Sequence, residues 1–349
     1  MQRALELAQQ GRYSVSPNPM VGCVIVKDGR VIGEGFHLRA GEPHAEINAL
    51  RSCSEPPEGA EMYVNLEPCA RHGRTPPCVD AVIAAGIGKL IVGTTDHAGG
   101  GDLKRIREAG IEVALGELRE ESERLNEKFL HAVENGVPFV LLKAGMTLDG
   151  KLATVTGESQ WITSPESRER SLELREECDA ILVGSRTVAK DNPFLTRRLG
   201  LNTSILPWRR IVLDASGTLD GSAQILNDGR PTLVYTSDPS RFQHGSAVEV
   251  MEVEATGGRI DLLQVLQDLH RREVRSVLVE GGAAVHSDFM RRRLWQKIIL
   301  FVAPMIVGGG EAPAIFHDAG ISKLEDAYSL RFDAVEPVGP DLMITAYPF

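Results

Sequence analysis

Apolar residues along the chain alternate between the spacing typical of β-strands and the spacing typical of α-helices. In the N-terminal part, short apolar runs predict strands at 21–27, 31–37, 62–66, 89–94 and 111–115. Helical spacing between them predicts helices at 3–10, 45–53, 79–85 and 102–109. Asp28-Gly29, between the first two strands, is a strong hairpin signal. This alternation predicts a three-layer α/β unit.

The remainder of the chain predicts a second α/β domain. The charged stretch 116–135 has apolar residues at helical spacing and predicts one surface helix that leads out of the first unit. Val137-Pro138 then opens a new strand, so we divide the chain into domains 1–140 and 141–349. The second domain has predicted strands at 139–145, 179–184, 210–214, 232–236, 247–253, 276–280 and 297–303. Its predicted helices lie near 165–176, 261–271 and 283–292.

Composition and charge narrow the class of protein. The 349 residues are 42% hydrophobic and 25% charged, and no apolar run is long enough for a membrane span or a signal peptide, so we expect a cytoplasmic protein without a membrane partner. The net charge is −10, from 15 basic and 20 acidic residues in 1–140 and 23 basic and 28 acidic residues in the rest. Because binding many phosphates would usually require a net basic face, we expect no nucleic-acid partner.

A metal-site pattern is present in the first domain. His44, Cys69 and Cys78 supply borderline and soft ligands and leave a fourth tetrahedral position for water, as catalytic zinc sites do. Glu46, two residues after the histidine, suits a proton carrier beside the metal. This is the zinc-deaminase signature, except that eight residues separate the cysteines instead of two. A zinc ribbon or inert core cysteines are the other interpretations, but the paired C-x-x-C knuckles of a ribbon are missing.

Ordered motifs extend through nearly the whole chain. In the first domain they are Asn18-Pro19-Met20-Val21-Gly22, Gly33-Glu34-Gly35-Phe36-His37, Pro43-His44-Ala45-Glu46, Asn65-Leu66-Glu67-Pro68-Cys69 and Gly73-Arg74-Thr75-Pro76-Pro77-Cys78. In the second they are Leu142-Lys143, Leu148-Asp149-Gly150, Ser159-Gln160-Trp161-Ile162-Thr163, Asp179-Ala180-Ile181-Leu182-Val183-Gly184, Thr187-Val188, Asp191-Asn192-Pro193 and Glu280-Gly281-Gly282. With these motifs and the long gap between its cysteines, the sequence resembles the bifunctional deaminase–reductase family of riboflavin biosynthesis.

The resemblance implies two consecutive reactions on one pyrimidine nucleotide. A first domain similar in fold to cytidine deaminases would hydrolyse the 2-amino group of 2,5-diamino-6-(5-phosphoribosylamino)pyrimidin-4(3H)-one. A second domain similar in fold to dihydrofolate reductase would reduce the ribosyl group of 5-amino-6-(5-phosphoribosylamino)uracil to a ribityl chain. The implied cofactors are Zn²⁺ and NADPH, the implied partner is this small-molecule substrate, and the implied assembly is a homo-oligomer.

The resemblance also implies roles for individual residues. In the first domain, His44, Cys69 and Cys78 match zinc ligands, Glu46 matches the proton shuttle, and base and phosphate contacts match Asn18, His37, Arg74 and Asp96. In the second, Lys143 and Glu280 match residues beside the sugar carbon that accepts hydride, and substrate contacts match Ser159, Arg175, Leu195 and Arg198. The dinucleotide side matches Gly145, Trp161, Thr187, Asp191, Ser216, Gly282, Ala283, Ala284, Val285, His286, Ser287 and Asp288.

Other interpretations remain open. Without the resemblance, Glu280-Gly281-Gly282 is an ordinary strand-to-helix turn, Trp161 an edge aromatic and Arg175 a solvated helix residue. The sequence also departs from the family's common pattern at Arg71 and in the short loop 97–102 after Asp96. The alternative function is a nucleic-acid-acting zinc deaminase with a non-catalytic C-terminal binding module, against which the acidic charge balance counts.

Overall fold

The computed structural model describes residues 1–73, 75–96, 100–215, 217, 219–241, 247–317 and 321–349. These residues form two compact units: unit 1 comprises 1–136 and 201–206, and unit 2 comprises 137–200 and 207–349. Arg74 and Ser216, both predicted site residues, lie outside the described residues, as do positions 97–99 of the loop after Asp96. None of the helices in the described ranges combines the length and apolarity that a bilayer crossing requires.

Unit 1 is built, in its described part, on a five-stranded sheet with the order β2-β1-β3-β4-β5. Its strands are β1 (Gly22–Lys27), β2 (Arg30–Phe36), β3 (Glu61–Leu66), β4 (Lys89–Thr94) and β5 (Glu112–Leu115). β1 pairs antiparallel with β2 and β3, whereas β3, β4 and β5 run parallel. The turn between β1 and β2 has φ values of 49° at Asp28 and 73° at Gly29, the positive pair that a tight hairpin turn requires, so the predicted hairpin is confirmed.

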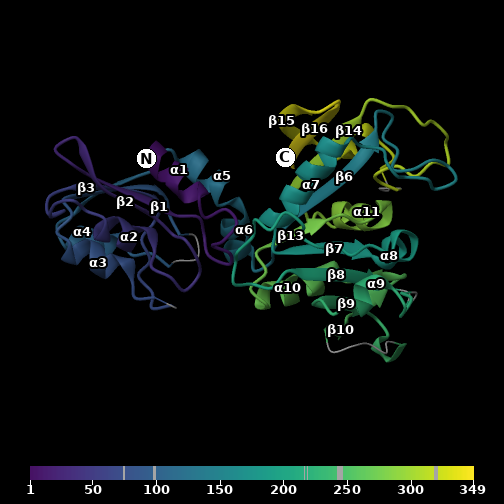
Figure 1. Cartoon of the computed structure of the whole chain (residues 1–349), viewed down its shortest axis with the longest axis horizontal. Helices are drawn as coiled ribbons and strands as arrows, with labels where there is room; N and C mark the ends of the chain where they lie inside the picture. The colour runs from purple at the N-terminus through teal and green to yellow at the C-terminus, as the bar shows by residue number, and fades with distance from the viewer. Residues whose placement is uncertain (74, 97–99, 216, 218, 242–246, 318–320) are drawn as a thin grey trace. The chain divides into compact units, whose positions relative to one another are not determined.

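Helices cover both faces of this sheet (Figure 1). One face carries α1 (Gln2–Gln9) and α5 (Arg119–Leu125), and the other carries α2 (Ala45–Arg51), α3 (Cys78–Ala84) and α4 (Leu103–Glu108). The three-layer prediction is therefore confirmed. The single helix predicted over 116–135 is wrong, because α5 is separated from α6 (Glu127–Asn135) at Asn126. The Asn126 side chain is buried and bonds both the N–H (2.8 Å) and the carbonyl (2.9 Å) of Met20, a tertiary contact that helical periodicity does not reveal.

Unit 2 contains, among the residues that can be described, a nine-stranded sheet with the order β10-β9-β8-β7-β13-β6-β14-β16-β15. The strands are β6 (Phe139–Thr147), β7 (Ala180–Gly184), β8 (Arg209–Asp214), β9 (Thr232–Thr236), β10 (Val248–Glu252), β13 (Ser276–Val279), β14 (Lys297–Ala303), β15 (Leu330–Val338) and β16 (Asp341–Pro348). Neighbours from β10 to β14 are parallel, and β16 pairs antiparallel with β14 and β15. A small separate hairpin joins β11 (Ala255–Thr256) to β12 (Arg259–Ile260).

The helices of unit 2 also lie on both faces of its sheet. α10 (Leu262–Arg271) and α11 (Ala283–Arg291) bury apolar side chains on one face. α7 (Pro165–Glu177), α8 (Ser185–Asp191) and α9 (Gln224–Asn227) contribute to the clusters on the other face. Two short 3₁₀ turns span Pro239–Arg241 and Leu324–Asp326. Because parallel strands end at the same edge, the loops that follow β6, β7, β8 and β13 gather at one side of the sheet.

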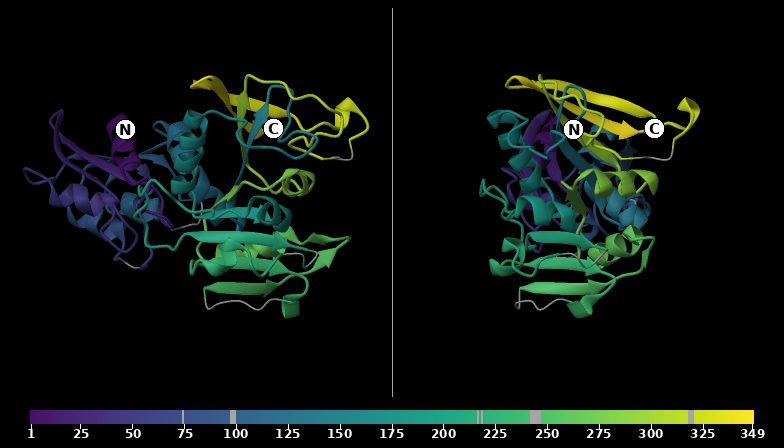
Figure 2. Two further views of the ribbon diagram at one scale, coloured as in Figure 1. Left: turned by 45° about the vertical axis from the view of Figure 1, so that its right-hand side comes forward. Right: turned by 90° about the vertical axis from the view of Figure 1, so that its right-hand side faces the viewer.

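The seven strands predicted in the second domain all form, but its last two strands were not predicted. Figure 2 shows β15 and β16, in yellow, as a ribbon at one edge of the sheet. Most residues of β15 are exposed, so the strand lacks the buried apolar run on which the prediction depended. The short helices α8 and α9 were missed for a similar reason, since each buries only two side chains.

Candidate active sites

Three metal-ligand side chains meet, among the described residues of unit 1, where two helices begin. His44 immediately precedes α2, Cys78 is the first residue of α3, and Cys69 lies in the loop after β3. The His44 Nδ1 atom lies 3.4 Å from Cys69 Sγ and 3.3 Å from Cys78 Sγ, and the ligand atoms are all within 4.8 Å of one another. In a tetrahedral zinc site, the lengths of the Zn–N and Zn–S bonds place the ligand atoms about 3.5 Å from one another. The donor set therefore fits zinc and leaves one position for water.

Hydrogen bonds orient the ligands of this cluster. Thr75 Oγ1 lies 3.0 Å from His44 Nε2, which turns the other ring nitrogen, Nδ1, toward the two sulfur atoms. The side chain of Cys78 bonds Cys69 and lowers the pKa of its thiol, and a hydrogen bond with His44 lowers it further. The backbone N–H of Cys78 also donates to Cys69 Sγ at 3.4 Å. Thr75 was not predicted as a site residue, and its place in the motif before Cys78 was the signal available.

Glu46 occupies the first turn of α2 beside this cluster. Its side chain is 3% exposed, and its Oε2 atom has no hydrogen-bond partner among the described residues. Burial raises the pKa of the Glu46 carboxyl. A buried carboxyl group with a free oxygen next to a metal-ligand set can accept and release a proton, which is the role predicted for it.

Asn18 and His37 also lie beside the cluster. The His37 ring is buried, and its centroid is 5.0 Å from that of His44. Its Nδ1 lies 3.2 Å from the Pro43 carbonyl and its Nε2 lies 3.0 Å from Asn18 Nδ2. Burial lowers the pKa of His37, so the neutral ring donates to Pro43 and accepts from Asn18 at neutral pH. The structure thus brings two of the predicted base and phosphate contacts to the ligand cluster.

Two asparagines that were not predicted as site residues hold the loop before β1. Asn65 is fully buried, accepts the N–H of Gly22 at 2.8 Å and donates to the Met20 carbonyl at 3.0 Å. Asn126 holds both backbone groups of Met20. Because Asn18 is two residues from Met20, these amides position it against His37. For Asn65 the sequence offers a signal, because it is an amide within an apolar strand and a buried amide requires hydrogen-bond partners.

Glu67 holds the two ends of the short loop that borders the cluster. Its carboxylate accepts the backbone N–H of Asp96 at 3.2 Å and that of Leu103 at 3.3 Å. A Cβ atom on Gly101 would lie 2.1 Å from Glu67 Cδ, and one on Gly100 would lie 2.1 Å from Asp96 Oδ2. Because they lack a Cβ atom, these glycines can lie close to Glu67 and Asp96, and Gly101 then forms a β-bridge with Cys69. This arrangement keeps Asp96 at the border of the site.

A charged cluster joins three elements of unit 2. Lys143 lies on β6, Glu280 directly follows β13, and Arg175 lies on α7, and the side chains are only 16%, 12% and 14% exposed. Arg175 donates to both oxygens of Glu280, at 3.0 and 2.9 Å, and Lys143 Nζ lies 4.0 Å from Glu280 Oε2. Burial raises the pKa of Glu280, but Arg175 and Lys143 outweigh it and hold the pKa at about 2. Burial lowers the pKa of Lys143. Arg175, predicted to contact the substrate, thus binds Glu280 in this structure.

The loop that carries Leu195 is held by two hydrogen bonds from β8 and the residue before it. Trp208 Nε1 donates to the Leu195 carbonyl at 2.8 Å, and Arg210 Nη1 donates to the Phe194 carbonyl at 3.0 Å. Leu195 itself is buried and has a φ of 50°. Arg197 stacks on Trp208 at 4.4 Å and donates to the Arg175 carbonyl at 3.0 Å. The loop is therefore tied to the charged cluster.

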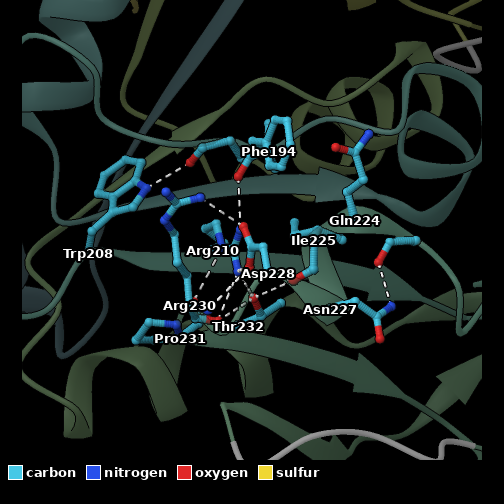
Figure 3. A network of polar contacts seen from close by, with 12 residues as sticks. Phe194, Trp208, Arg210, Gln224, Ile225, Asn227, Asp228, Arg230, Pro231 and Thr232 are labelled. Carbon is cyan, nitrogen blue, oxygen red and sulfur yellow. Dashed lines mark hydrogen bonds and ion pairs between the residues drawn. The ribbon is translucent and has the colours of Figure 1, made fainter.

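Arg210 is fully buried at the centre of this network (Figure 3). Its guanidinium donates to both carboxylate oxygens of Asp228, at 2.6 and 2.7 Å, and to Thr232 Oγ1 at 2.7 Å. It also donates to the carbonyls of Ile225 and Arg230. Through these hydrogen bonds the buried guanidinium connects α9 and β9 to the loop that carries Leu195. Of the other predicted substrate contacts, Arg198 is exposed and Ser159 is half-buried.

A cavity of about 550 Å³ lies at the beginning of α8 and α11. The predicted dinucleotide residues that line it are Thr187, Gly282, Ala283, Ala284, Val285, Ser287 and Asp288. Neither helix has a side-chain cap at its first turn, so backbone N–H groups are available to a phosphate. Glycine is required at Gly281, where a Cβ would lie 2.7 Å from Val285 Cβ. The volume and the donors fit a dinucleotide cofactor.

Four other predicted dinucleotide residues do not line this cavity. The His286 ring is buried, with Nε2 3.3 Å from the Val279 carbonyl. Trp161 is 68% exposed and stacks under Arg168, Asp191 is the last residue of α8, and Gly145 lies inside β6. The lining residues that were not predicted include Arg186, Gly257, Gly258, Arg259 and Arg291. The glycine pair before Arg259 was the signal available.

Together, the two units define a two-site enzyme, with a zinc-type hydrolytic deaminase site in unit 1 and a dinucleotide-dependent reductase site in unit 2. Residues 1–94 match the cytidine and deoxycytidylate deaminase zinc-binding region, and residues 138–344 match the RibD C-terminal domain. The chain belongs to the family of the riboflavin biosynthesis protein RibD. It is a bifunctional deaminase and reductase, and the matched domains imply Zn²⁺ and NADPH.

Relatives and solved structures match over almost the full length. The Escherichia coli K12 protein RibD is 40% identical over 358 residues, which cover 99% of this chain and 97% of the relative. Aquifex aeolicus RibD is also 40% identical, over 99% of this chain and 96% of the relative. The structure of Acinetobacter baumannii RibD, form 1, has a TM-score of 0.88 at 35% identity, and that of a Thermotoga maritima diaminohydroxyphosphoribosylaminopyrimidine deaminase/5-amino-6-(5-phosphoribosylamino)uracil reductase has 0.89 at 37%. Each comparison covers 100% of this chain and 97% of the other. The α/β fold with a cytidine-deaminase-like first unit and a reductase as second unit is confirmed.

Proposed function

We propose that residues 1–140 convert 2,5-diamino-6-(5-phosphoribosylamino)pyrimidin-4(3H)-one to 5-amino-6-(5-phosphoribosylamino)uracil. Residues 141–349 then reduce the product to 5-amino-6-(5-phosphoribitylamino)uracil with NADPH. The observation that carries the proposal is the pairing, on one chain, of a His44–Cys69–Cys78 cluster beside Glu46 with the largely buried Lys143–Glu280 pair. The names of the Thermotoga maritima relative, which state both activities, support it.

Deamination requires a nucleophile and a proton carrier. Zinc held by His44, Cys69 and Cys78 would make a water molecule nucleophilic near neutral pH. Glu46 takes the proton from this water and delivers it to the departing amine, so that a C–O bond forms, the C–N bond breaks and ammonia leaves. Asn18 and His37 orient the pyrimidine through their amide and imidazole groups.

Reduction requires a hydride and a proton. Bound NADPH would supply the hydride to the sugar carbon C1′, and Lys143 supplies the proton to the nitrogen of the opened imine. Burial, which lowers the pKa of Lys143, makes the ammonium a better proton donor than an exposed lysine. Glu280, held ionised by Arg175, keeps the ammonium in place. Arg198, which is exposed on the loop beside this cluster, is the proposed phosphate contact.

The dinucleotide fits the cavity at the start of α8 and α11. We assign its phosphate contacts to Thr187 and to the stretch Gly282–Val285, with Ser287 and Asp288 as further lining residues. The assignments of Gly145, Trp161, Asp191, Ser216 and His286 stay predictions from the resemblance.

The test is a coupled assay on zinc-loaded full-length protein. Ammonia release from the diaminopyrimidine nucleotide and, separately, loss of NADPH absorbance with the deaminated product are both expected. Ammonia release without NADPH oxidation would make unit 2 a non-catalytic module. Ammonia release from RNA at a rate comparable to the free nucleotide would favour the nucleic-acid-acting alternative.

We further propose that the enzyme is a cytoplasmic homo-oligomer. Its five cysteines, each of which lies in the described part of the chain, are free, as is usual in the cytoplasm. β15 is an edge strand on which Phe332 and Val335 are 67% and 55% exposed, and exposed apolar side chains on an edge strand favour pairing with a second copy. Sedimentation equilibrium tests this: Phe332→Glu is expected to shift the mass toward the monomer, and an unchanged mass would move the interface elsewhere.

A further inference from the structure

Three arginines line the cavity of unit 2, as far as its residues can be described. Arg291 forms an ion pair with Asp288, at 3.5 Å, and its charge is therefore partly compensated. Arg186 and Arg259 are exposed, and among the described residues neither forms an ion pair with a carboxylate. The cavity thus offers two uncompensated guanidinium groups to an entering anion.

The strand order shows where these two groups lie relative to the chemistry. Lys143 and Glu280 belong to β6 and the end of β13, and the neighbouring strands are β7 and then β8. The cavity lining begins at the start of α11, after β13, and continues through the start of α8, after β7, to Leu213 and Ala215 at the end of β8. Because adjacent strands are about 5 Å apart, the end of β8 lies about 10 Å from that of β13. The cavity therefore runs along the strand ends, away from the catalytic pair.

An extended dinucleotide has one orientation that suits this layout. Its nicotinamide must reach Lys143 and Glu280, because the hydride is transferred there. Its pyrophosphate then meets the uncapped starts of α11 and α8, which face each other: a Cβ on Gly282 would lie 3.7 Å from Thr187 Oγ1. The adenosine half is left at the end of β8 and the β11–β12 hairpin, where Arg259 lies.

We propose that Arg259 binds the 2′-phosphate of the adenosine ribose and thereby selects NADPH over NADH. This inference rests on the proposed reductase function. The hairpin turn is Gly257-Gly258, with φ values of 60° and 73°, so the turn carries no side chain and Arg259 is the first side chain after it. A guanidinium can bind a phosphate through two parallel hydrogen bonds, and a nearby arginine is a common means of accommodating the 2′-phosphate of NADP.

Arg186 has a different role in this proposal. It lies in the first turn of α8, beside Thr187, where the pyrophosphate meets the helix start. NADPH and NADH share the pyrophosphate, so Arg186 strengthens the binding of both cofactors equally. Only Arg259, on the β11–β12 hairpin, contacts the 2′-phosphate, the group by which NADPH differs from NADH.

Equilibrium binding on the zinc-loaded full-length protein tests the proposal. Quenching of tryptophan fluorescence reports the Kd of NADPH and NADH, because all three tryptophans belong to unit 2. Arg259→Gln is expected to raise the Kd of NADPH about 10- to 100-fold, the usual range for charge-assisted hydrogen bonds, and to leave the Kd of NADH within twofold. Arg186→Gln is expected to raise both values by the same factor. Lys323→Gln, which removes an exposed charge outside the cavity, is the control and leaves both unchanged.

Each contrary outcome has a distinct meaning. An equal loss of NADPH and NADH binding in Arg259→Gln would overturn the proposal, as would loss of the discrimination in Arg186→Gln alone. Wild-type protein that binds both cofactors equally would also overturn it but would leave the reductase function intact. Binding of neither cofactor by protein that still releases ammonia would contradict both the inference and the proposed reductase. Ammonia release in every variant confirms that unit 1 is folded, and retained NADH binding in Arg259→Gln confirms that unit 2 is folded.

Discussion

Glu46 is buried and Glu280 is largely buried, yet their surroundings shift their pKa values in opposite directions. Glu46 has an oxygen without a hydrogen-bond partner in the described structure, and burial raises its pKa. Glu280 is also shielded from water, but Arg175 and Lys143 hold its pKa at about 2. The comparison shows that burial alone does not decide the role of a carboxyl group, since its partners determine whether it carries a proton or a permanent charge.

The two sites also differ in how far apart their parts lie in the sequence. The zinc-type ligands are contained in residues 44–78 and are placed by the starts of α2 and α3. Arg175 and Glu280 are 105 positions apart and meet only because α7 packs beside the end of β13. A metal-ligand cluster can be recognised in the sequence from its residue types. The pKa values of a charged cluster are shifted by burial and by its charged neighbours, which only the folded structure shows.

The largest expected effect is the loss of the ligand cluster. Cys69→Ser is expected to lose zinc and ammonia release altogether and to destabilise unit 1, because metal binding contributes to the folding of its site. Zinc content and the thermal unfolding of unit 1 measure this. Cys53→Ser, in the same unit and outside the cluster, is the matched control and should keep its zinc. Full deaminase activity in Cys69→Ser would remove Cys69 from the ligand set.

The second prediction is that substitution of one proton carrier lowers one of the two activities and leaves the other unchanged. Glu46→Gln is expected to keep zinc and lower ammonia release about 10²- to 10⁴-fold, while Lys143→Met lowers NADPH oxidation by a similar factor. Each variant should leave the other activity within twofold, which would show that the substitution acts only on the site of its own unit. Unimpaired NADPH oxidation in Lys143→Met would refute its catalytic assignment.

The third prediction concerns acid stability. Because the pKa of folded Glu280 is about 2, below its ordinary value of 4.5, its charge stabilises unit 2 above pH 4.5 and this stabilisation disappears as the pH falls toward 2. The loss amounts to about 2–3 kcal/mol. Urea unfolding followed by tryptophan fluorescence should therefore show a steeper decrease in the free energy of unfolding between pH 5 and 2.5 in the wild type than in Glu280→Gln. Equal slopes would mean that folding does not lower the pKa of Glu280.

The smallest expected effect is at the Leu195 loop. Trp208→Phe removes one hydrogen bond, from Nε1 to the Leu195 carbonyl, and is expected to raise the KM for the pyrimidine nucleotide about 3- to 10-fold with kcat unchanged. Steady-state kinetics at saturating NADPH measures KM and kcat separately. Trp295→Phe, a buried change outside the loop, is the control and should affect stability but not KM. A fall in kcat instead would assign the loop to catalysis rather than to substrate positioning.

Local patterns were sufficient where neighbours in the chain determine the structure. The Asp28-Gly29 turn follows from its positive φ values, and the buried strands of both sheets follow from their apolar runs. Tertiary contacts decided the cases in which prediction failed. Asn126 breaks a helix that its own segment favours, because its amide binds Met20 from another part of the chain. β15 was missed because pairing with β16, not burial, makes it a strand.

The sequence by itself therefore determined the α/β alternation, the His44–Cys69–Cys78 ligand set and the family, since residue type and short-range spacing encode all three. Only the tertiary structure decided that Arg175 binds Glu280, that the His286 ring faces the core, and that Arg259 lines the cavity of unit 2. The physical reason is that charge pairing and burial depend on which distant segments pack together. No local spacing in the sequence records that packing.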